Sequence, residues 1–251
     1  MEKNGPVSSP RQVVLLLRGL RTFGGWQERL RGLLAGRSVE VVVYRYGRLG
    51  APVFLVPGLR RLMVRRLQRF LREDPALRAA RRLDLVCHSF GSYLALQALA
   101  GLAADEGPRV QTLILCGSVL KQSHPWAAQV GPDRRVGRVI NECGERDVWP
   151  TMAQLFVVGM GAAGRYGFAP GVAGPRVLDR FHPTLRHNDF FTARFMSRYW
   201  LPIFDRDGEP PEKAAASRPQ PSWSSLVEPI SEPLKLLFWL LLLGGLASLW
   251  M

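Results

Sequence analysis

The chain has few of the residues from which disulfides, metal sites and imidazole chemistry are built. Its 251 residues include three cysteines and four histidines. Cys87, Cys116 and Cys143 each lie at or near the end of an apolar run, where cysteine acts as a small hydrophobic residue. An odd and sparse set of this kind excludes a disulfide framework and indicates a reducing compartment. No zinc-ligand spacing is present, and we expect neither a metal nor a cofactor.

The N-terminus lacks the apolar core of a secretory signal peptide. Residues 1–12 are polar and contain Pro6 and Pro10. We therefore expect a disordered tail over these residues, and no export of the protein body by that route.

Acidic residues are scarce relative to basic ones. The 34 lysines and arginines outnumber the 20 aspartates and glutamates, which gives a net charge of +14. Such a charge suits an anionic membrane surface or nucleic acid, or it reflects a compositional preference for arginine. No helix-turn-helix pattern or aromatic-basic string accompanies the charge, so nucleic acid is not favoured as a partner.

Short apolar runs alternate with helical segments from residue 13 to residue 204. Several runs are uniformly apolar, which is typical of parallel strands buried on both faces. We therefore predict an α/β domain over residues 13–204, with a mostly parallel sheet covered by helices on both faces. The expected strands are 13–17, 39–46, 83–87, 110–116, 136–140 and 176–181.

Residues 59–73 have helical spacing, with arginines crowded on one face. A membrane-surface helix has this pattern, and so does a helix that covers a sheet and turns a charged face to water. We favour the second interpretation.

The composition changes after Phe204. Residues 205–233 are rich in proline and serine and predict a linker. Residues 234–251 are apolar apart from Lys235, and as a helix they extend ~27 Å, against a hydrocarbon core of ~30 Å. We expect a single-pass C-terminal membrane anchor with the body cytoplasmic. The alternative is a hydrophobic helix docked on the body or on another subunit.

One stretch combines an apolar run, a serine and a helix-forming run. The serine is Ser89, within Cys87-His88-Ser89-Phe90-Gly91. A strand-turn-helix "nucleophile elbow" has this pattern, because the sharp turn lifts the serine hydroxyl clear of the sheet. Incidental placement of a serine between a strand and a helix is the alternative.

A serine nucleophile needs an imidazole base and a carboxylate that orients it. Asp147 follows the fifth expected strand and His187 follows the last, so both belong at the edge of the sheet that carries Ser89. Glu142 and Glu145 are alternative acids, His182 is an alternative base, and Asp147 could simply cap a helix. His88 is expected to be structural.

Residues 13–204 resemble the α/β-hydrolase superfamily, in a compact form without two leading antiparallel strands. The resemblance rests on LLLRGLRTFGGW, LDLVCHSFGSYLALQAL, LILCGSVL and NECGERDVWP. It implies that Ser89 is the nucleophile, Asp147 the acid and His187 the base. It also implies that the backbone N–H groups of Phe90 and Leu20 hold the oxyanion. Two residues depart from the family pattern, since Arg18 replaces a histidine and Cys87 a glycine.

The glycine pattern Gly159-Met160-Gly161-Ala162-Ala163-Gly164 resembles a dinucleotide fingerprint. Such a site needs a long helix directly after the glycines, and the glycines and prolines of residues 167–175 forbid one. We therefore expect a flexible apolar flap here.

Together these features predict a membrane-tethered serine hydrolase that acts on carboxylic esters, lipid-like esters included. The alternative is a catalytically silent hydrolase-fold protein that serves as a membrane-bound scaffold.

Overall fold

The computed structural model describes residues 12–19, 25–45, 54–103, 105–205 and 223–248. Within the last segment, side chains are described for residues 227–241. Leu20 and residues 1–11 of the expected tail lie outside these ranges, whereas Gln12, the last residue of that expected tail, begins the first strand.

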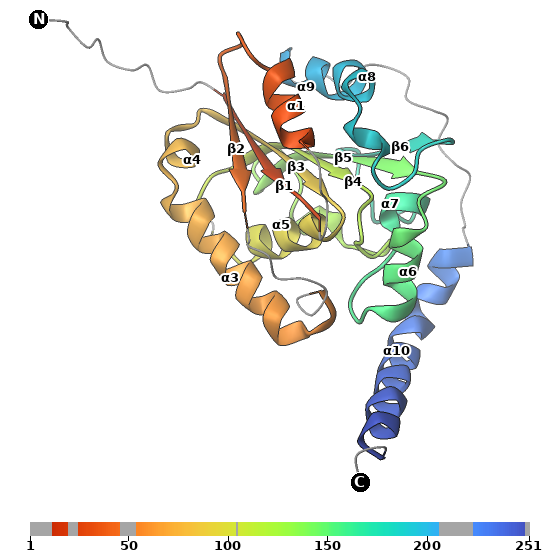
Figure 1. Ribbon diagram of the computed structural model, residues 1–251. Coiled ribbons are helices and arrows are strands. Elements are labelled where there is room, and N and C mark those ends of the chain that lie inside the picture. Colours follow the sequence, from red (N-terminus) through yellow and green to blue (C-terminus); the bar gives the residue numbers. More distant parts are fainter. Residues whose placement is uncertain (1–11, 20–24, 46–53, 104, 206–222, 249–251) are drawn as a thin grey trace, which may run out of the picture.

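Six strands of the described chain form one sheet in which all neighbouring strands are parallel (Figure 1). The order across the sheet is β2-β1-β3-β4-β5-β6. The direction of strand addition therefore reverses between β1 and β3, and ligands of open parallel sheets bind at the carboxyl ends beside such a reversal. The strands are β1 (Gln12–Leu17), β2 (Val39–Tyr44), β3 (Arg82–His88), β4 (Val110–Cys116), β5 (Val136–Gly144) and β6 (Val177–His182).

Alternate residues of β1 belong to two separate cores. Val13, Leu15 and Leu17 pack with α3 (Pro57–Glu73) and α5 (Phe90–Ala100). Val14 and Leu16 pack with α1 (Trp26–Leu33) and the aromatic residues near the end of the domain. Since both faces of the strand are buried, a uniformly apolar sequence suits it. The predicted parallel sheet with helices on both faces is confirmed (Figure 1).

Shorter elements complete the domain. The remaining helices are α4 (Pro75–Ala79), α6 (Trp149–Phe156), α7 (Ala163–Tyr166), α8 (Ala193–Phe195), α9 (Leu201–Asp205) and α10 (Trp223–Ser248). Single turns of 3₁₀ helix occur at Trp126–Ala128 and Asp189–Phe191, and a π turn at Met196–Trp200.

The structure corrects two details of the sheet and its cover. β5 extends beyond the predicted residue 140 to Gly144, which places Glu142 inside a strand. Helix α3 covers the sheet as expected, but Arg60 is buried instead of lying on the charged outer face. Its Nη1 donates a 2.7 Å hydrogen bond to the carbonyl oxygen of Val158. This bond fixes the beginning of α3 against the turn after α6.

The prediction of a linker over residues 205–233 is wrong for its last part, because α10 begins at Trp223. Pro229 and Pro233 lie inside this helix, where each lacks an N–H for the helical ladder. Tertiary contacts compensate: the Glu228 carboxylate accepts bonds from the N–H groups of Gln122 at 2.7 Å and Ser123 at 3.1 Å. Sequence periodicity gives no sign of such contacts.

Residues 234–248 continue α10, as expected of a C-terminal helix. Part of the helix contacts the body: Glu228, Ser231 and Lys235 are buried, and Trp239 Nε1 donates to the carbonyl oxygen of Phe156 at 2.9 Å. Across the described residues, no helix combines the length and the apolar composition that a membrane crossing needs.

Candidate active site

Ser89 occupies a strained turn between β3 and α5. Its backbone has a φ of 51° and a ψ of −123°. Among the described residues, Ser89 is the only one other than glycine with a positive φ. Such a conformation costs about 1–3 kcal/mol and persists only where surrounding contacts hold it. Here the Ser89 N–H donates to the carbonyl oxygen of Cys116 at 3.0 Å, and the Ser92 N–H and Oγ both donate to the Ser89 carbonyl oxygen. Strain at a serine between a strand and a helix is the geometry expected of a nucleophile elbow.

Gly91 allows the end of β1 to approach the beginning of α5. A Cβ at this position would lie 2.8 Å from the Leu17 carbonyl oxygen and 2.9 Å from that of Arg18. The loop that follows β1 therefore starts beside the first turn of α5. Phe90 is the first residue of that turn, whose N–H groups have no partner within the helix. Leu20, the other expected oxyanion donor, lies outside the described residues.

Asp147 is buried beyond the end of β5, and each of its carboxylate oxygens has a partner. Oδ1 accepts from the N–H of Trp149 at 3.0 Å, at the start of α6. Oδ2 lies 2.7 Å from His187 Nδ1. The carboxylate thus caps a helix and binds an imidazole at the same time. Glu145 lies in the same loop, but the contact to His187 is made by Asp147.

The His187 loop is held in place by backbone bonds that extend the β5–β6 pairing. The N–H of Glu145 donates to the His182 carbonyl oxygen and that of Arg146 to the Leu185 carbonyl oxygen, both at 3.1 Å. Because a carboxylate only accepts, the proton of the neutral His187 ring lies on Nδ1. Nε2 then carries the lone pair of a base.

Gly117 lies between the Ser89 turn and the Asp147–His187 pair. It follows Cys116, whose carbonyl oxygen binds the Ser89 N–H, and its φ is +54°. A Cβ on Gly117 would lie 2.9 Å from both Asp147 Oδ2 and His187 Nδ1. The Ser89 turn and the Asp147–His187 pair therefore meet at this glycine. Sequence reasoning missed its role, although its position directly after a strand was a usable signal.

His88 is buried beneath His187. The two rings are 4.4 Å apart at their centroids, and His88 Nε2 lies 2.9 Å from the His187 carbonyl oxygen. Burial lowers the pKa of His88 well below its ordinary value, and the neighbouring His187 lowers it further. The expectation of a structural histidine thus gains a definite contact, made to the loop of the candidate base.

The alternative acid Glu142 and the alternative base His182 bind each other. His182 Nε2 lies 2.8 Å from Glu142 Oε2, while Arg180 Nε at 3.0 Å and Trp200 Nε1 at 3.2 Å donate to the same carboxylate. All four side chains are buried. Burial raises the pKa of Glu142, but Arg180 and His182 outweigh it and hold that pKa below its ordinary value. The cluster joins β5 and β6 to the end of the domain.

The glycine-rich segment 159–164 is packed, and the expectation of an apolar flap is wrong. The N–H of Gly161 donates to Val119 O, and that of Gly164 to Ser118 O, both at 2.9 Å. A Cβ on Gly164 would lie 2.0 Å from the Ser118 backbone nitrogen, so close backbone approach explains the glycine. Helix α7 after it is only 4 residues long. No long helix follows to face a pyrophosphate.

An aromatic side chain borders the site. Trp149 is 61% exposed, and its ring centroid lies 6.3 Å from that of His187. Among the described residues, no three histidine, cysteine, aspartate or glutamate side chains are placed to hold a metal ion.

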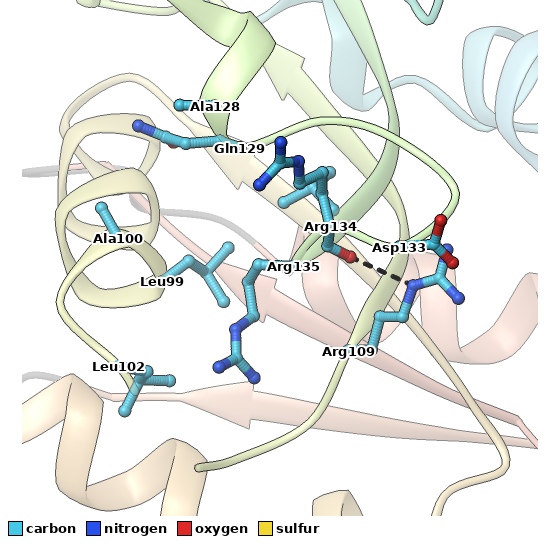
Figure 2. A pocket seen from close by; sticks show the side chains of 10 residues that line it. Leu99, Ala100, Leu102, Arg109, Ala128, Gln129, Asp133, Arg134 and Arg135 are labelled. Atoms are coloured by element: carbon cyan, nitrogen blue, oxygen red, sulfur yellow. Dashed lines mark hydrogen bonds between the residues drawn. The ribbon is translucent and has the colours of Figure 1, made fainter. Parts of the chain in front are cut away.

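A cavity of about 500 Å³ lies at the other end of the sheet (Figure 2). Arg109 and Arg135, which line it, directly precede β4 and β5, so the cavity is at the amino ends of the strands. Ser89, Asp147 and His187 lie beyond the carboxyl ends. Arg109 Nε donates to the Arg134 carbonyl oxygen at 3.2 Å, and Arg135 Nη1 to that of Gly107 at 3.2 Å. These arginines therefore stabilise loops at the edge of the sheet opposite the candidate site.

Comparison with known proteins agrees with the fold. Residues 14–248 match the alpha/beta hydrolase family. This match covers most of the chain, which therefore belongs to the alpha/beta hydrolase family. No curated protein matches the chain.

Several solved structures are similar to the chain at low sequence identity. The product of gene lin2722 from Listeria innocua is 11% identical with a TM-score of 0.53, over 81% of this chain and 97% of that one. An esterase from Pseudomonas putida is 15% identical with a TM-score of 0.45, over 76% of this chain and 70% of that one. A CIB-like hydrolase from Thermoplasma acidophilum is 13% identical with a TM-score of 0.47, over 73% and 81%.

Proposed function

We propose that the protein is a serine hydrolase of carboxylic esters, with Ser89 as nucleophile, His187 as base and Asp147 as the acid that orients the base. The observation that carries the proposal is the junction at Gly117. There a strained serine turn meets a 2.7 Å carboxylate–imidazole contact. Family membership supports hydrolase chemistry, and the residues supply its mechanism.

In the proposed reaction, His187 Nε2 takes the proton of Ser89 Oγ while the oxygen attacks the ester carbonyl carbon. The N–H groups of Phe90 and Leu20 hold the oxyanion. Collapse breaks the bond to the alcohol oxygen, which leaves with the proton from His187, and the acyl group remains on Ser89. Water, activated by His187, then releases the acid and restores Ser89. Asp147 keeps the proton on Nδ1 throughout.

The exposed Trp149 beside His187 supports an ester with an apolar acyl or lipid-like part.

We propose in addition that α10 attaches the protein to a membrane. Its exposed leucines and the net charge of +14 support this attachment. Comparing carbonate extraction of the full chain with that of a chain ending at Pro233 tests it. Equal extraction of the two chains contradicts attachment through the tail.

Covalent labelling with a fluorophosphonate tests the hydrolase proposal. The wild type should be labelled, whereas Ser89→Ala should not be. Ser197→Ala removes an exposed serine far along the chain and should be labelled like the wild type.

An unlabelled wild type with an intact fold contradicts the proposal, as does labelling of Ser89→Ala. The first of these results favours the scaffold alternative. Circular dichroism of each variant confirms that the fold has been kept.

A further inference from the structure

Helix α10 is polar toward the protein and apolar toward its surroundings. Glu228, Ser231 and Lys235 are buried against the body. The outward side chains are apolar and 44–69% exposed, namely Ile230, Leu234, Leu236, Leu237, Phe238, Leu240 and Leu241. A surface helix in water has the opposite arrangement, with its apolar stripe facing the core.

Specific polar contacts fix this orientation. Lys235 Nζ donates to the Met160 carbonyl oxygen at 3.1 Å and to Glu232 Oε1 at 3.0 Å. Glu232 also accepts from the Gly159 N–H at 3.0 Å, and Glu228 accepts from the loop after β4. If the helix were rotated so that its apolar face pointed inward, Lys235, Glu232 and Glu228 would lose these hydrogen-bond partners. The helix is therefore built to keep its apolar face outward.

Helix α6 extends the apolar surface toward the candidate site. Its exposed side chains are Trp149, Met152, Leu155 and Phe156. The Phe156 ring lies 5.9 Å from that of Phe238 in α10, which joins the two helices. Trp149 at the other end of α6 is the side chain beside His187.

The beginning of α3 adds a third part. Leu55, Val56, Leu59 and Leu62 are 37–46% exposed. Arg60 ties this end to Val158, next to the turn that binds α10. We call the exposed apolar side chains of these three segments the apolar rim. Beyond it, α3 carries a row of exposed arginines, Arg61, Arg65, Arg66, Arg69 and Arg72.

We propose that the apolar rim lies in the surface of an anionic lipid bilayer, so that ester substrates enter the Ser89–His187 site from the membrane. The second clause rests on the proposed function. Amphipathic surfaces of this kind bury their apolar face at the boundary of headgroups and acyl chains, and flanking arginines attract anionic lipids. Figure 1 shows α10 extending from α6 away from the sheet, with no other described element beside its C-terminal part.

The net positive charge favours an anionic bilayer over a second copy of the chain as the partner of the apolar rim. Two copies that each carry +14 repel each other, whereas an anionic membrane attracts both. The apolar rim also borders Trp149, and a lipid surface there places acyl chains beside the candidate base. In this arrangement the membrane is both the partner and the source of the substrate.

Flotation of the full-length protein with vesicles tests the binding step. The vesicles are phosphatidylcholine, with or without phosphatidylglycerol, and the variant is Leu237→Glu/Leu241→Glu. Both leucines are more than half exposed, at 52% and 67%, so the fold should survive. We expect the wild type to float with anionic vesicles and the variant to bind about 10-fold more weakly for each leucine. Leu178→Glu on β6, which is 44% exposed outside the apolar rim, should bind like the wild type.

Two esters separate this inference from the proposed function. A short soluble ester should be hydrolysed equally by the wild type and the variant, while a long-chain ester embedded in vesicles should be hydrolysed by the wild type alone. Wild-type vesicle binding by the variant overturns the inference, and so does an equal loss with both esters. If the variant instead turns a dimer into a monomer without vesicles, the apolar rim is an interface between copies and the inference is wrong. Flotation without hydrolysis of either ester contradicts the proposed function alone.

Discussion

His88 Nε2 lies 2.9 Å from the backbone carbonyl oxygen of His187. Burial keeps His88 neutral, because it lowers the pKa of the ring well below its ordinary value. A carbonyl oxygen can only accept, so Nε2 carries the proton and donates it to the His187 loop. The residue before the candidate nucleophile thus positions the candidate base.

We expect His88→Met to lower kcat for a soluble ester by about 10-fold, because loss of one buried hydrogen bond releases the His187 loop. The side-chain N–H of glutamine can occupy the place of Nε2, so His88→Gln should recover much of the loss. The measurement is kcat and KM of both variants, with KM little changed. Equal activity of the two variants contradicts a positioning role.

The two carboxylate–imidazole pairs should respond differently to neutralisation. Asp147→Asn should lower kcat by about 10³–10⁴-fold, because the amide no longer holds the His187 proton on Nδ1. Glu142→Gln should instead destabilise the protein by about 3–5 kcal/mol, because Arg180 is left buried without a counter-charge.

Denaturant unfolding and the kcat of the folded protein separate these effects. The assignment is contradicted if the neutralised Glu142 variant folds normally but loses activity, while the Asp147 variant keeps it.

The sequence predicted the sheet because buried parallel strands have a recognisable local pattern. Apolar runs mark the strands at the centre of the sheet, and Ser89 follows one of them. Asp147 and His187 follow β5 and β6, which also contain polar residues. The sheet then gathers strand ends at one edge whatever the detailed packing is. The structure brings Asp147 and His187 into contact as this reasoning expected.

What the sequence left undetermined depends on contacts between distant residues. Glu142 and His182 qualify as acid and base by residue type, and only the buried Arg180 and Trp200 beside them show a structural cluster. In the sequence Arg60 resembles the other arginines of α3, and only the structure shows its hydrogen bond to the Val158 carbonyl oxygen. Helix α10 begins among prolines because distant backbone N–H groups bind Glu228. No local propensity encodes such partners.

Gly117 offers a steric test of the site with a matched control. In Gly117→Ala the new Cβ meets Asp147 and His187 at 2.9 Å, and it is also strained by a φ of +54°. Gly36→Ala has the same backbone strain at a φ of +79° but nothing within 4 Å of the Cβ. Both variants should lose about 1–2 kcal/mol of stability.

Only Gly117→Ala should also lose kcat, by about 10²-fold, because it displaces the candidate acid and base. Ester hydrolysis and thermal unfolding of the two variants provide the comparison. Unchanged kcat in folded Gly117→Ala would show that the carboxylate–imidazole pair is not used in the reaction.

Asp179 should make the protein less stable as the pH rises through weakly acidic values. Burial raises the pKa of Asp179 to about 6 from an ordinary 3.8, although Asn141 and the Phe168 N–H donate to its oxygens. The folded state therefore binds more protons than the unfolded state between these values, and stability falls with rising pH.

Relative to Asp179→Asn, which does not titrate, the wild type should lose about 1.5 kcal/mol of unfolding free energy between pH ~5 and pH ~7.5. Urea unfolding of both proteins at the two pH values measures the difference. Titration of His88 is common to both proteins and has the opposite sign, since its depressed pKa removes stability at low pH. The comparison cancels that contribution, so parallel pH profiles would mean that Asp179 stays ionised in the fold.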